Sequence, residues 1–490
     1  MTDTTTPEHL DVLVVGAGIS GICAAHYLRT ECPWATYAVL EGRQTMGGTW
    51  DLFRYPGIRS DSDMHTLGFS FRPWDGELSI AEGADILEYL KDTAADEGID
   101  RHIRYGHRVR SAEWSSEEAR WLLTVDVTDA GGTTREERLT CGFLFSCSGY
   151  YRYDRGHQPA FDGVDNFGGQ LIHPQFWPED FDATGKDVVV IGSGATAMTL
   201  VPALARTAHH VTMLQRSPTY VISLPRTSSA AAFFTKWLPG RTGRTATRWF
   251  HALTSQGFYN VSRRRPEKVK QVLVKGVAER LPEGYDVERH FTPRYDPWDE
   301  RVCVVPKGDL FTAIREDRAT VVTDTIDTFT PTGIRLASGE ELTADVVVTA
   351  TGLEILFLGG IDVTVDGEPL VPHDHLTYMG MMLDDVPNLA MTVGYTNASW
   401  TLKAELTCQH VCRLLNHMRS SGTRVVVAHN DDPSVDDVPL MPLSSGYLRR
   451  AAGDLPRQGS RFPWQVHQSF LKDSRAMRRS KVDDGVVQFR

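Results

Sequence analysis

Two short segments of this chain share a pattern that few folds can accommodate. In each, an apolar run of β-forming residues leads directly into a glycine-rich turn, and a helix-forming stretch follows. The first strand and turn span residues 11–21, and the second span 187–197. A buried parallel strand, a tight glycine turn and a helix together form a dinucleotide-binding unit. The sequence therefore predicts an α/β fold with two Rossmann-like dinucleotide-binding domains.

The first turn reads Gly-Ala-Gly-Ile-Ser-Gly from Gly16 to Gly21. Gly16 permits the tight turn, Gly18 lets the backbone approach a pyrophosphate, and Gly21 lets the helix pack on the strand. The phosphates would face the helix N-terminus around Ser20, where the positive end of the helix dipole lies. The next strand ends in Glu41, whose carboxylate can accept hydrogen bonds from ribose hydroxyls and would repel a 2′-phosphate. This site is predicted to bind FAD or NAD rather than NADP.

The second turn carries alanine at its third small position, which the helix packing permits. Arg216 stands at the end of the following strand, where the first unit has Glu41. An arginine there can hold a 2′-phosphate through charge-assisted hydrogen bonds, so this site is predicted to prefer NADPH. The residues predicted to contact NADPH are Gly192, Ser193, Gly194, Ala195, Thr196, Ala197, Arg216 and Ser217. The first unit thus has a carboxylate where the second has a guanidinium. This difference predicts one FAD site and one NADPH site, and hence hydride transfer from NADPH to FAD.

The segment after Glu41 favours FAD at the first site. It contains Gly47-Gly48-Thr49-Trp50, then Tyr55-Pro56-Gly57, then Asp61. The glycines would bring the backbone close to a flat ligand, Trp50 offers an aromatic wall, and Thr49 and Asp61 supply oxygen atoms for hydrogen bonds. Taken alone, Trp50 could be a core residue and Asp61 a helix cap.

The stretch 167–178 lies between the two turns and is predicted to be a loop, because paired glycines and two prolines interrupt it. It matches the pattern F-x-G-x-x-x-H-x-x-x-W-P, and the segment 47–61 matches G-G-x-W-x-x-x-x-Y-P-G-x-x-x-D. Both patterns are typical of Baeyer–Villiger monooxygenases, flavoproteins that oxidise ketones and sulfides. The whole chain resembles that family, and most closely its ethionamide-activating branch.

The resemblance implies roles for further residues. Gly48, Thr49, Trp50 and Asp61 would line the flavin site. Arg59 and Ser60 would lie near the nicotinamide cofactor, and Val109 would meet the adenine of FAD through its backbone.

Arg301 takes the place of the family's catalytic arginine, and Asp61 would hold it as its charge partner. A guanidinium stays charged at every working pH and could stabilise an anionic C4a-peroxyflavin. Without the resemblance, Arg301 would be read as an ordinary surface ion pair. Glu300 stands where many family members carry a lysine that helps to bind the 2′-phosphate. This departure bears on the affinity for NADPH and not on the preference for it.

The function implied is an FAD- and NADPH-dependent Baeyer–Villiger monooxygenase. It would insert one oxygen atom of O2 into a ketone to give an ester or lactone, and would oxidise sulfides to sulfoxides. A predominantly sulfide- or thioamide-oxidising enzyme is the first alternative, and an NADPH-dependent flavin reductase or oxidase is the second. A disulfide reductase would need a redox cysteine pair, and the seven cysteines include no C-x-x-C. General flavin monooxygenases lack the Trp177-Pro178 ending, and a redox sensor would not need Arg216.

The two units divide the chain into domains. Residues 9–149 are expected to form the first part of the FAD-binding domain and residues 355–490 its second part. Residues 150–354 are expected to form the NADPH-binding domain, with a helical insertion at about 228–290.

Several local elements are also predicted. Residues 150–155 look like a linker, residues 388–395 like a strand, and Asn397 or Ser399 like the N-cap of a helix that runs to about Met418. Residues 449–490 are polar and irregular in pattern, and no role is assigned to them.

The net charge of −12 argues against a nucleic-acid partner. No metal site is predicted, and the oligomeric state stays open. No apolar run approaches the ~18 residues of a membrane span, and residues 1–8 do not resemble a signal peptide. A cytoplasmic protein is therefore expected. The basic stretch 241–275 is read as a solvated helix face, or as a weak contact with an acidic membrane.

Overall fold

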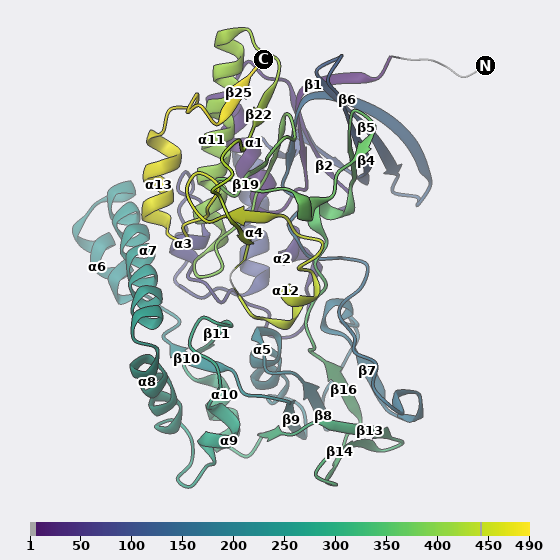
Figure 1. Cartoon of the computed structure of the whole chain (residues 1–490). Helices are drawn as coiled ribbons and strands as arrows, with labels where there is room; N and C mark the ends of the chain where they lie inside the picture. Colours follow the sequence, from purple (N-terminus) through teal and green to yellow (C-terminus); the bar gives the residue numbers. More distant parts are fainter. Residues whose placement is uncertain (1–5, 442) are drawn as a thin grey trace.

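The computed structural model describes residues 6–441 and 443–490 and contains two large sheets (Figure 1). The nine-stranded sheet lies in the upper half of the view and the five-stranded sheet in the lower half. The strands of the first sheet are β1 (Glu8–Val15), β2 (Tyr37–Glu41), β3 (Ile103–Tyr105), β4 (His107–Ser115), β5 (Arg120–Thr128), β6 (Thr134–Ser146), β17 (Asp362–Val365), β18 (Glu368–Pro369) and β21 (Leu389–Met391). Their order is β18-β17-β4-β5-β6-β1-β2-β3, and β21 also pairs with β6.

The long strand β6 joins the antiparallel part of this sheet to its parallel part. Its first part pairs antiparallel with β5, and its second part pairs parallel with β1. Side chains of β5 alternate between buried and half-buried, whereas the last four residues of β1 are all buried. The alternation is expected for a strand with one solvated face, and the continuous burial for a parallel strand covered on both faces. The covered part holds the first glycine turn.

Helices α1 (Ile19–Glu31), α4 (Gly83–Asp96) and α11 (Trp400–Ser421) pack with this sheet, with α1 and α11 side by side. Ser399 is the N-cap of α11, which confirms one of the two predicted N-caps, although its side chain makes no capping hydrogen bond. The Ser399 hydroxyl instead lies 2.6 Å from the Thr66 hydroxyl, and the Asn397 amide donates to the carbonyl of Gln468.

The C-terminal region is ordered, contrary to the irregular segment expected for residues 449–490. Helix α13 (Phe470–Arg479) packs on α11, and β25 (Val487–Phe489) pairs with β22 (Val426–Ala428). The buried carboxylate of Asp473 accepts from Lys403 at 3.2 Å and from the Tyr395 hydroxyl at 2.9 Å. Sequence patterns did not show these bonds because their partners lie about 70 residues away.

The predicted strand 388–395 is shorter than expected and covers only Leu389–Met391. Three residues after the strand ends, the chain passes Gly394, where a Cβ would lie 2.4 Å from the ring of Trp400. The indole packed against this turn leaves no room for a continued strand.

The second sheet has the order β12-β9-β8-β16-β7 and is entirely parallel. Its strands are β7 (Gln170–Ile172), β8 (Asp187–Ile191), β9 (His210–Gln215), β12 (Ala319–Thr323) and β16 (Val346–Thr349). The prediction that residues 167–178 form only a loop was therefore partly wrong, because β7 is an edge strand. Ile172 is buried in the core of this sheet, and its burial stabilises the pairing of β7 with the sheet.

Four helices lie between β10 (Tyr220–Leu224) and β11 (Val302–Pro306), and the first three of them run along one side of the molecule (Figure 1). They are α6 (Ser229–Trp237), α7 (Gly240–Arg264), α8 (Pro266–Ala278) and α9 (Val287–Phe291). The remaining elements are α2 (Thr49–Leu52), α3 (Met64–Leu67), α5 (Ala195–Leu204), α10 (Asp309–Arg315), α12 (Gly446–Arg450), β13 (Ile326–Thr330), β14 (Gly333–Leu336), β15 (Glu341–Thr343), β19 (Thr377–Tyr378), β20 (Met382–Leu383), β23 (Asp437–Pro439) and β24 (Arg457–Gly459). Among the described residues, no helix is both long and apolar enough to cross a bilayer.

The chain crosses between the two sheets at residues 150–157 and returns at 350–356, and these two crossings pair with each other. Backbone bonds join Arg152 N to Glu354 O and Leu356 N to Tyr150 O, both at 2.9 Å. The Gln175 amide of the central stretch donates to two carbonyls of the first crossing at 2.9 Å each. The central stretch thus braces the connection between the two halves.

Candidate cofactor and active site

The two glycine turns have the same local geometry. Gly16 has a φ of +100° and Gly192 a φ of +137°, which side chains other than glycine rarely adopt. A Cβ at Gly16 would lie 2.6 Å from the carbonyl oxygen of Cys147, and one at Gly192 would lie 2.4 Å from that of Ala350. In both units the turn therefore packs against the end of the neighbouring parallel strand.

The other turn positions show where a ligand has room. A Cβ at Gly21 would lie 1.8 Å from the carbonyl oxygen of Gly16, so this position requires glycine, whereas the second turn accommodates the buried Ala197. A Cβ at Gly194 would meet nothing within 4 Å, and one at Gly18 would meet only Gly48, from 3.6 Å. Space is thus open in front of the N-termini of α1 and α5, where a phosphate group would bind.

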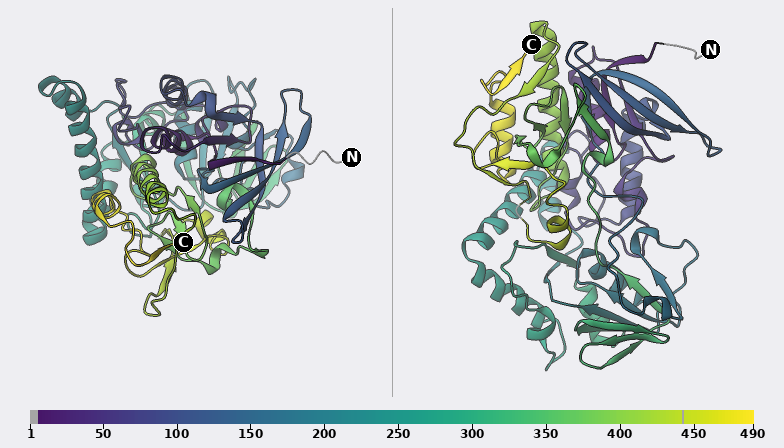
Figure 2. Two further views of the ribbon diagram at one scale, coloured as in Figure 1. Left: turned by 90° about the horizontal axis from the view of Figure 1, so that it is seen from above. Right: turned by 45° about the vertical axis from the view of Figure 1, so that its right-hand side comes forward.

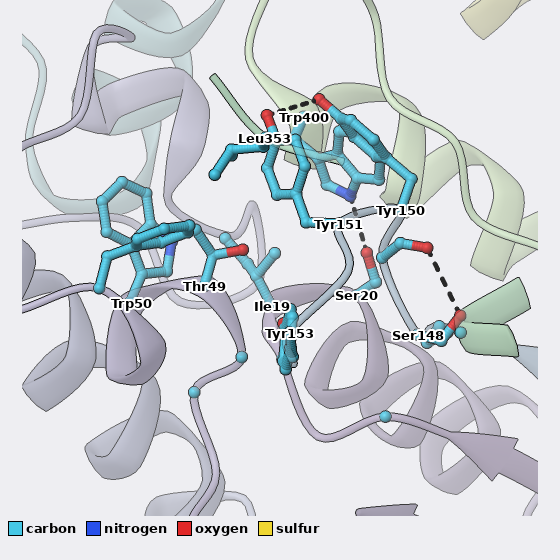
Figure 3. Close-up of a pocket in the computed structure, with 18 of the residues that line it drawn as sticks. Ile19, Ser20, Thr49, Trp50, Ser148, Tyr150, Tyr151, Tyr153, Leu353 and Trp400 are labelled. Carbon is cyan, nitrogen blue, oxygen red and sulfur yellow. Dashed lines mark hydrogen bonds between the residues drawn. The ribbon is translucent and has the colours of Figure 1, made fainter. Parts of the chain in front are cut away.

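One cavity of about 530 Å³ is lined by residues of the first turn, by Glu41 and by the start of α5, and Figure 3 shows part of its lining. Its lining includes these predicted site residues: Gly16, Gly18, Ser20, Glu41, Gly48, Thr49, Trp50, Arg59, Ser60, Asp61, Val109, Ala195, Thr196 and Arg301. The predicted residues outside the lining are Gly21, Gly192, Ser193, Gly194, Ala197, Arg216 and Ser217. The cavity therefore brings together every residue of the first predicted site except Gly21, which packs the helix on the strand. Of the residues predicted to contact NADPH, Ala195 and Thr196 at the start of α5 also line it.

Glu41 lines the cavity at the end of β2. Its carboxylate accepts hydrogen bonds from the backbone N–H groups of Ala17 and Arg43, both at 2.9 Å. Burial raises the pKa of Glu41, and these two N–H groups partly offset the effect. Each carboxylate oxygen still has a lone pair for a donor in the cavity, as a ribose hydroxyl would be.

Arg301 and Asp61 both line the cavity, with 3.5 Å between Arg301 Nη1 and Asp61 Oδ2. The side chain of Arg301 is 37% exposed, and its Nε has no hydrogen-bond partner among the described residues. Burial lowers the pKa of Arg301, but Tyr447, Tyr150, Tyr151 and Asp61 outweigh it and raise the pKa above its ordinary range. The result is a permanent cation in the lining of the cavity.

Sequence reasoning missed an aromatic wall formed by Tyr150, Tyr151, Tyr153 and Trp400 (Figure 3). The hydroxyls of Tyr150 and Tyr151 are 3.0 Å apart, and the Trp400 ring stacks on Tyr150 at 5.3 Å. Trp400 Nε1 donates to the Ser20 hydroxyl at 2.8 Å. The residues first read as a linker thus line the cavity. Their position directly after β6 was an available signal, because ligands of such sheets bind beyond the carboxyl ends of the strands.

Arg59 and Ser60 line the cavity, but their polar atoms are already paired within the protein. Arg59 forms a 2.7 Å ion pair with Asp309 and is only 6% exposed, and the Ser60 hydroxyl donates to the carbonyl of Ser62. Val109 is a buried residue of β4 beside a register shift in the β4–β5 ladder. Arg59 and Ser60 shape the loop that carries Asp61.

The rim of the second unit combines charges of both signs. Arg216 is exposed and forms no ion pair within the described part of the chain, and the Ser193 hydroxyl donates to the carbonyl of Ser217. Burial raises the pKa of Glu300, and nearby Arg449 and Arg216 oppose that shift. Glu300 therefore lies within electrostatic range of the arginine predicted to hold the 2′-phosphate.

Replacement of Glu300 by lysine is expected to lower KM for NADPH by roughly threefold to tenfold. The partly exposed carboxylate of Glu300 repels the 2′-phosphate, whereas a lysine would attract it. KM for NADH, which lacks the 2′-phosphate, should not change. Steady-state kinetics with both coenzymes measure this, with Glu279→Gln at the exposed C-terminal cap of α8 as the control. An equal fall for NADH would show that Glu300 does not act on the phosphate.

Comparison with known proteins agrees with this geometry. The sequence matches a model described as flavin-binding monooxygenase-like over residues 69–233 and one described as an NAD(P)-binding Rossmann-like domain over residues 14–75. The FAD-containing monooxygenase EthA of Mycobacterium tuberculosis is 54% identical over 98% of each chain. The chain belongs to the FAD-containing monooxygenases. The probable FAD-binding monooxygenase AlmA of Acinetobacter sp is 45% identical over 98% of this chain and 96% of its own.

Two solved structures show that this monooxygenase has the fold predicted from its two glycine turns. An oxidized steroid monooxygenase bound to NADP superimposes with a TM-score of 0.76 at 22% identity, over 98% of this chain and 99% of that one. An open structure of cyclohexanone monooxygenase gives a TM-score of 0.76 at 20% identity, over 99% and 100%. The α/β fold with two Rossmann-like domains is confirmed, as is FAD as a cofactor.

Proposed function

We propose that this monooxygenase uses NADPH and O2 to insert one oxygen atom into ketones, giving esters or lactones, and that it also converts sulfides to sulfoxides. The observation that carries the proposal is the position of Arg301. Its guanidinium lines the same cavity as Glu41 and the first residues of α5. An oxygen-transferring site needs such a fixed cation where both cofactors meet.

The residues present fit FAD along the first unit. Gly18 leaves room for the pyrophosphate, Glu41 would accept the ribose hydroxyls, and Thr49 and Trp50 would border the ring system. NADPH would lie across the second turn with its 2′-phosphate beside Arg216. The open space in front of Gly194 supports this placement.

Reduced FAD supplies the activated oxygen when it is bound. Arg301 would stabilise the negative charge that develops on oxygen during transfer, because a guanidinium keeps its charge and offers donors in a fixed plane. Asp61 would orient Arg301. The aromatic wall of Tyr150, Tyr151 and Trp400 would exclude water and so strengthen these electrostatic interactions.

A preference for sulfides or thioamides over ketones is the second candidate. It is favoured by the 54% identity with EthA and by the resemblance to the ethionamide-activating branch. The ketone activity is supported by the resemblance of the central stretch to the Baeyer–Villiger pattern. The two solved structures are named for a steroid and for cyclohexanone, which is a ketone.

The test uses the purified, FAD-loaded protein with NADPH, O2 and a panel of one ketone, one sulfide and one thioamide. We expect close to one oxygenated product per NADPH consumed, with one atom of ¹⁸O2 recovered in the ester or sulfoxide. Sulfoxide formation without ester formation would select the second candidate. Stoichiometric hydrogen peroxide with every substrate would contradict the proposal and leave a reductase or oxidase.

A further inference from the structure

Helices α6 and α7 contain basic residues and no acidic ones, and the proposed function does not require this composition. The sequence contains no aspartate or glutamate between Asp187 and Glu267, and residues 226–266 contain eight lysines and arginines. The whole chain has a net charge of −12. The positive charge is therefore concentrated in one part of an otherwise acidic protein.

The same helices expose large apolar side chains. None of the nine residues of α6 is buried, although five are alanine or phenylalanine and a tryptophan follows. Phe233 is 58% and Trp237 66% exposed, and they lie one turn apart on α6. The ring of Phe234 lies 5.5 Å from that of Phe233 and 5.9 Å from that of Phe250 on α7. We call Phe233, Phe234, Trp237, Phe250 and Leu253 the α6–α7 patch.

This patch is presented at the periphery on a firmly held helix. Figure 2 shows the teal helices at the outer edge of the molecule in both views. Helix α7 is fixed by a buried ion pair, in which Arg248 Nη2 lies 2.9 Å from Glu405 Oε2 of α11. Arg248 Nη1 also donates to the carbonyl of Thr66 at 3.1 Å. Because Arg248 is neutralised inside the protein, its charge is not counted with the patch.

Two cations border the patch without an acidic partner in the described structure. Lys236 Nζ lies 5.6 Å from the centre of the Trp237 ring, and Arg241 is exposed at the start of α7. Arg244 differs from them, because it lines a groove with Asp75 and Glu77 that can balance its charge. The surface around the patch is thus apolar, aromatic and locally positive.

We propose that the α6–α7 patch binds the surface of a lipid bilayer that contains anionic lipids. Tryptophan and phenylalanine insert at the boundary between headgroups and acyl chains, and flanking lysine and arginine attract anionic headgroups within a Debye length. A second copy of the chain fits less well, because a two-fold contact would place Lys236 and Arg241 of both copies against each other. The inference is independent of the proposed function.

The experiment is cosedimentation of the FAD-loaded full-length protein with vesicles of phosphatidylcholine alone or mixed with phosphatidylglycerol. We expect binding to the mixed vesicles that weakens as salt is raised. The double variant F233S/W237S should reduce the partition coefficient at least about tenfold. K236E/R241E should reduce it by roughly fivefold for each charge. Val371→Ser, at a 50% exposed site outside α6–α8, is the matched control and should not change binding.

Two results would overturn the proposal. The first is that wild-type protein does not sediment with mixed vesicles, and the second is that both double variants sediment as well as wild type. If light scattering shows self-association that F233S/W237S abolishes, and vesicles are not bound, the patch contacts a second copy instead. FAD content and NADPH oxidation should stay at the wild-type level in both variants, since none of these side chains lines the cavity.

Discussion

Replacement of Arg301 by alanine is expected to lower the rate of oxygen transfer to a ketone by roughly 10²–10³-fold. The reason is that oxygen transfer builds negative charge beside the cavity, and Arg301 lines this cavity with a guanidinium whose Asp61 partner lies 3.5 Å away. Reduction of FAD by NADPH needs no such charge and should stay close to wild type. The variant should therefore consume NADPH and release hydrogen peroxide instead of product.

Product, hydrogen peroxide and NADPH are measured in parallel, and anaerobic reduction of FAD is followed separately. Arg301→Lys should recover part of the oxygen transfer, because it restores the charge but not the planar set of donors. Asp61→Asn should have a smaller effect, since it only loosens the orientation of Arg301. Arg335→Ala, which breaks an exposed ion pair with Asp327, is the control. Unchanged ester formation in Arg301→Ala would show that Arg301 has a structural role.

The local parts of the site could be predicted from the sequence. Gly16 and Gly192 follow from backbone rules that act within a few residues, and the structure shows them in matching turns. Glu41 and Arg216 follow from their positions at strand ends. These predictions needed only the order of strand, turn and helix.

The parts that depend on long-range packing could not be predicted in this way. Trp400 donates to Ser20 across 380 positions, and Arg301 meets Asp61 across 240. No periodicity or spacing connects such pairs, so Arg301 was found only through the family resemblance and Trp400 was missed. The position of Ser399 at the N-cap of α11 was predicted, but the pairing of its hydroxyl with Thr66 from another helix was not.

Replacement of Arg216 by glutamine is expected to raise KM for NADPH by roughly tenfold to a hundredfold, the effect of losing hydrogen bonds between a cation and a phosphate. KM for NADH should change little, so the preference between the coenzymes should largely disappear. Arg216→Glu should go further and favour NADH, because it recreates in the second unit the carboxylate that Glu41 provides in the first.

Arg206→Ala, at an exposed arginine just after α5, is the control. The measurement is kcat/KM for both coenzymes at several salt concentrations, and the NADPH values of wild type should fall with salt more steeply than those of Arg216→Gln. Equal losses for NADPH and NADH would contradict the role of Arg216, since a contact with the 2′-phosphate cannot affect a coenzyme that lacks it.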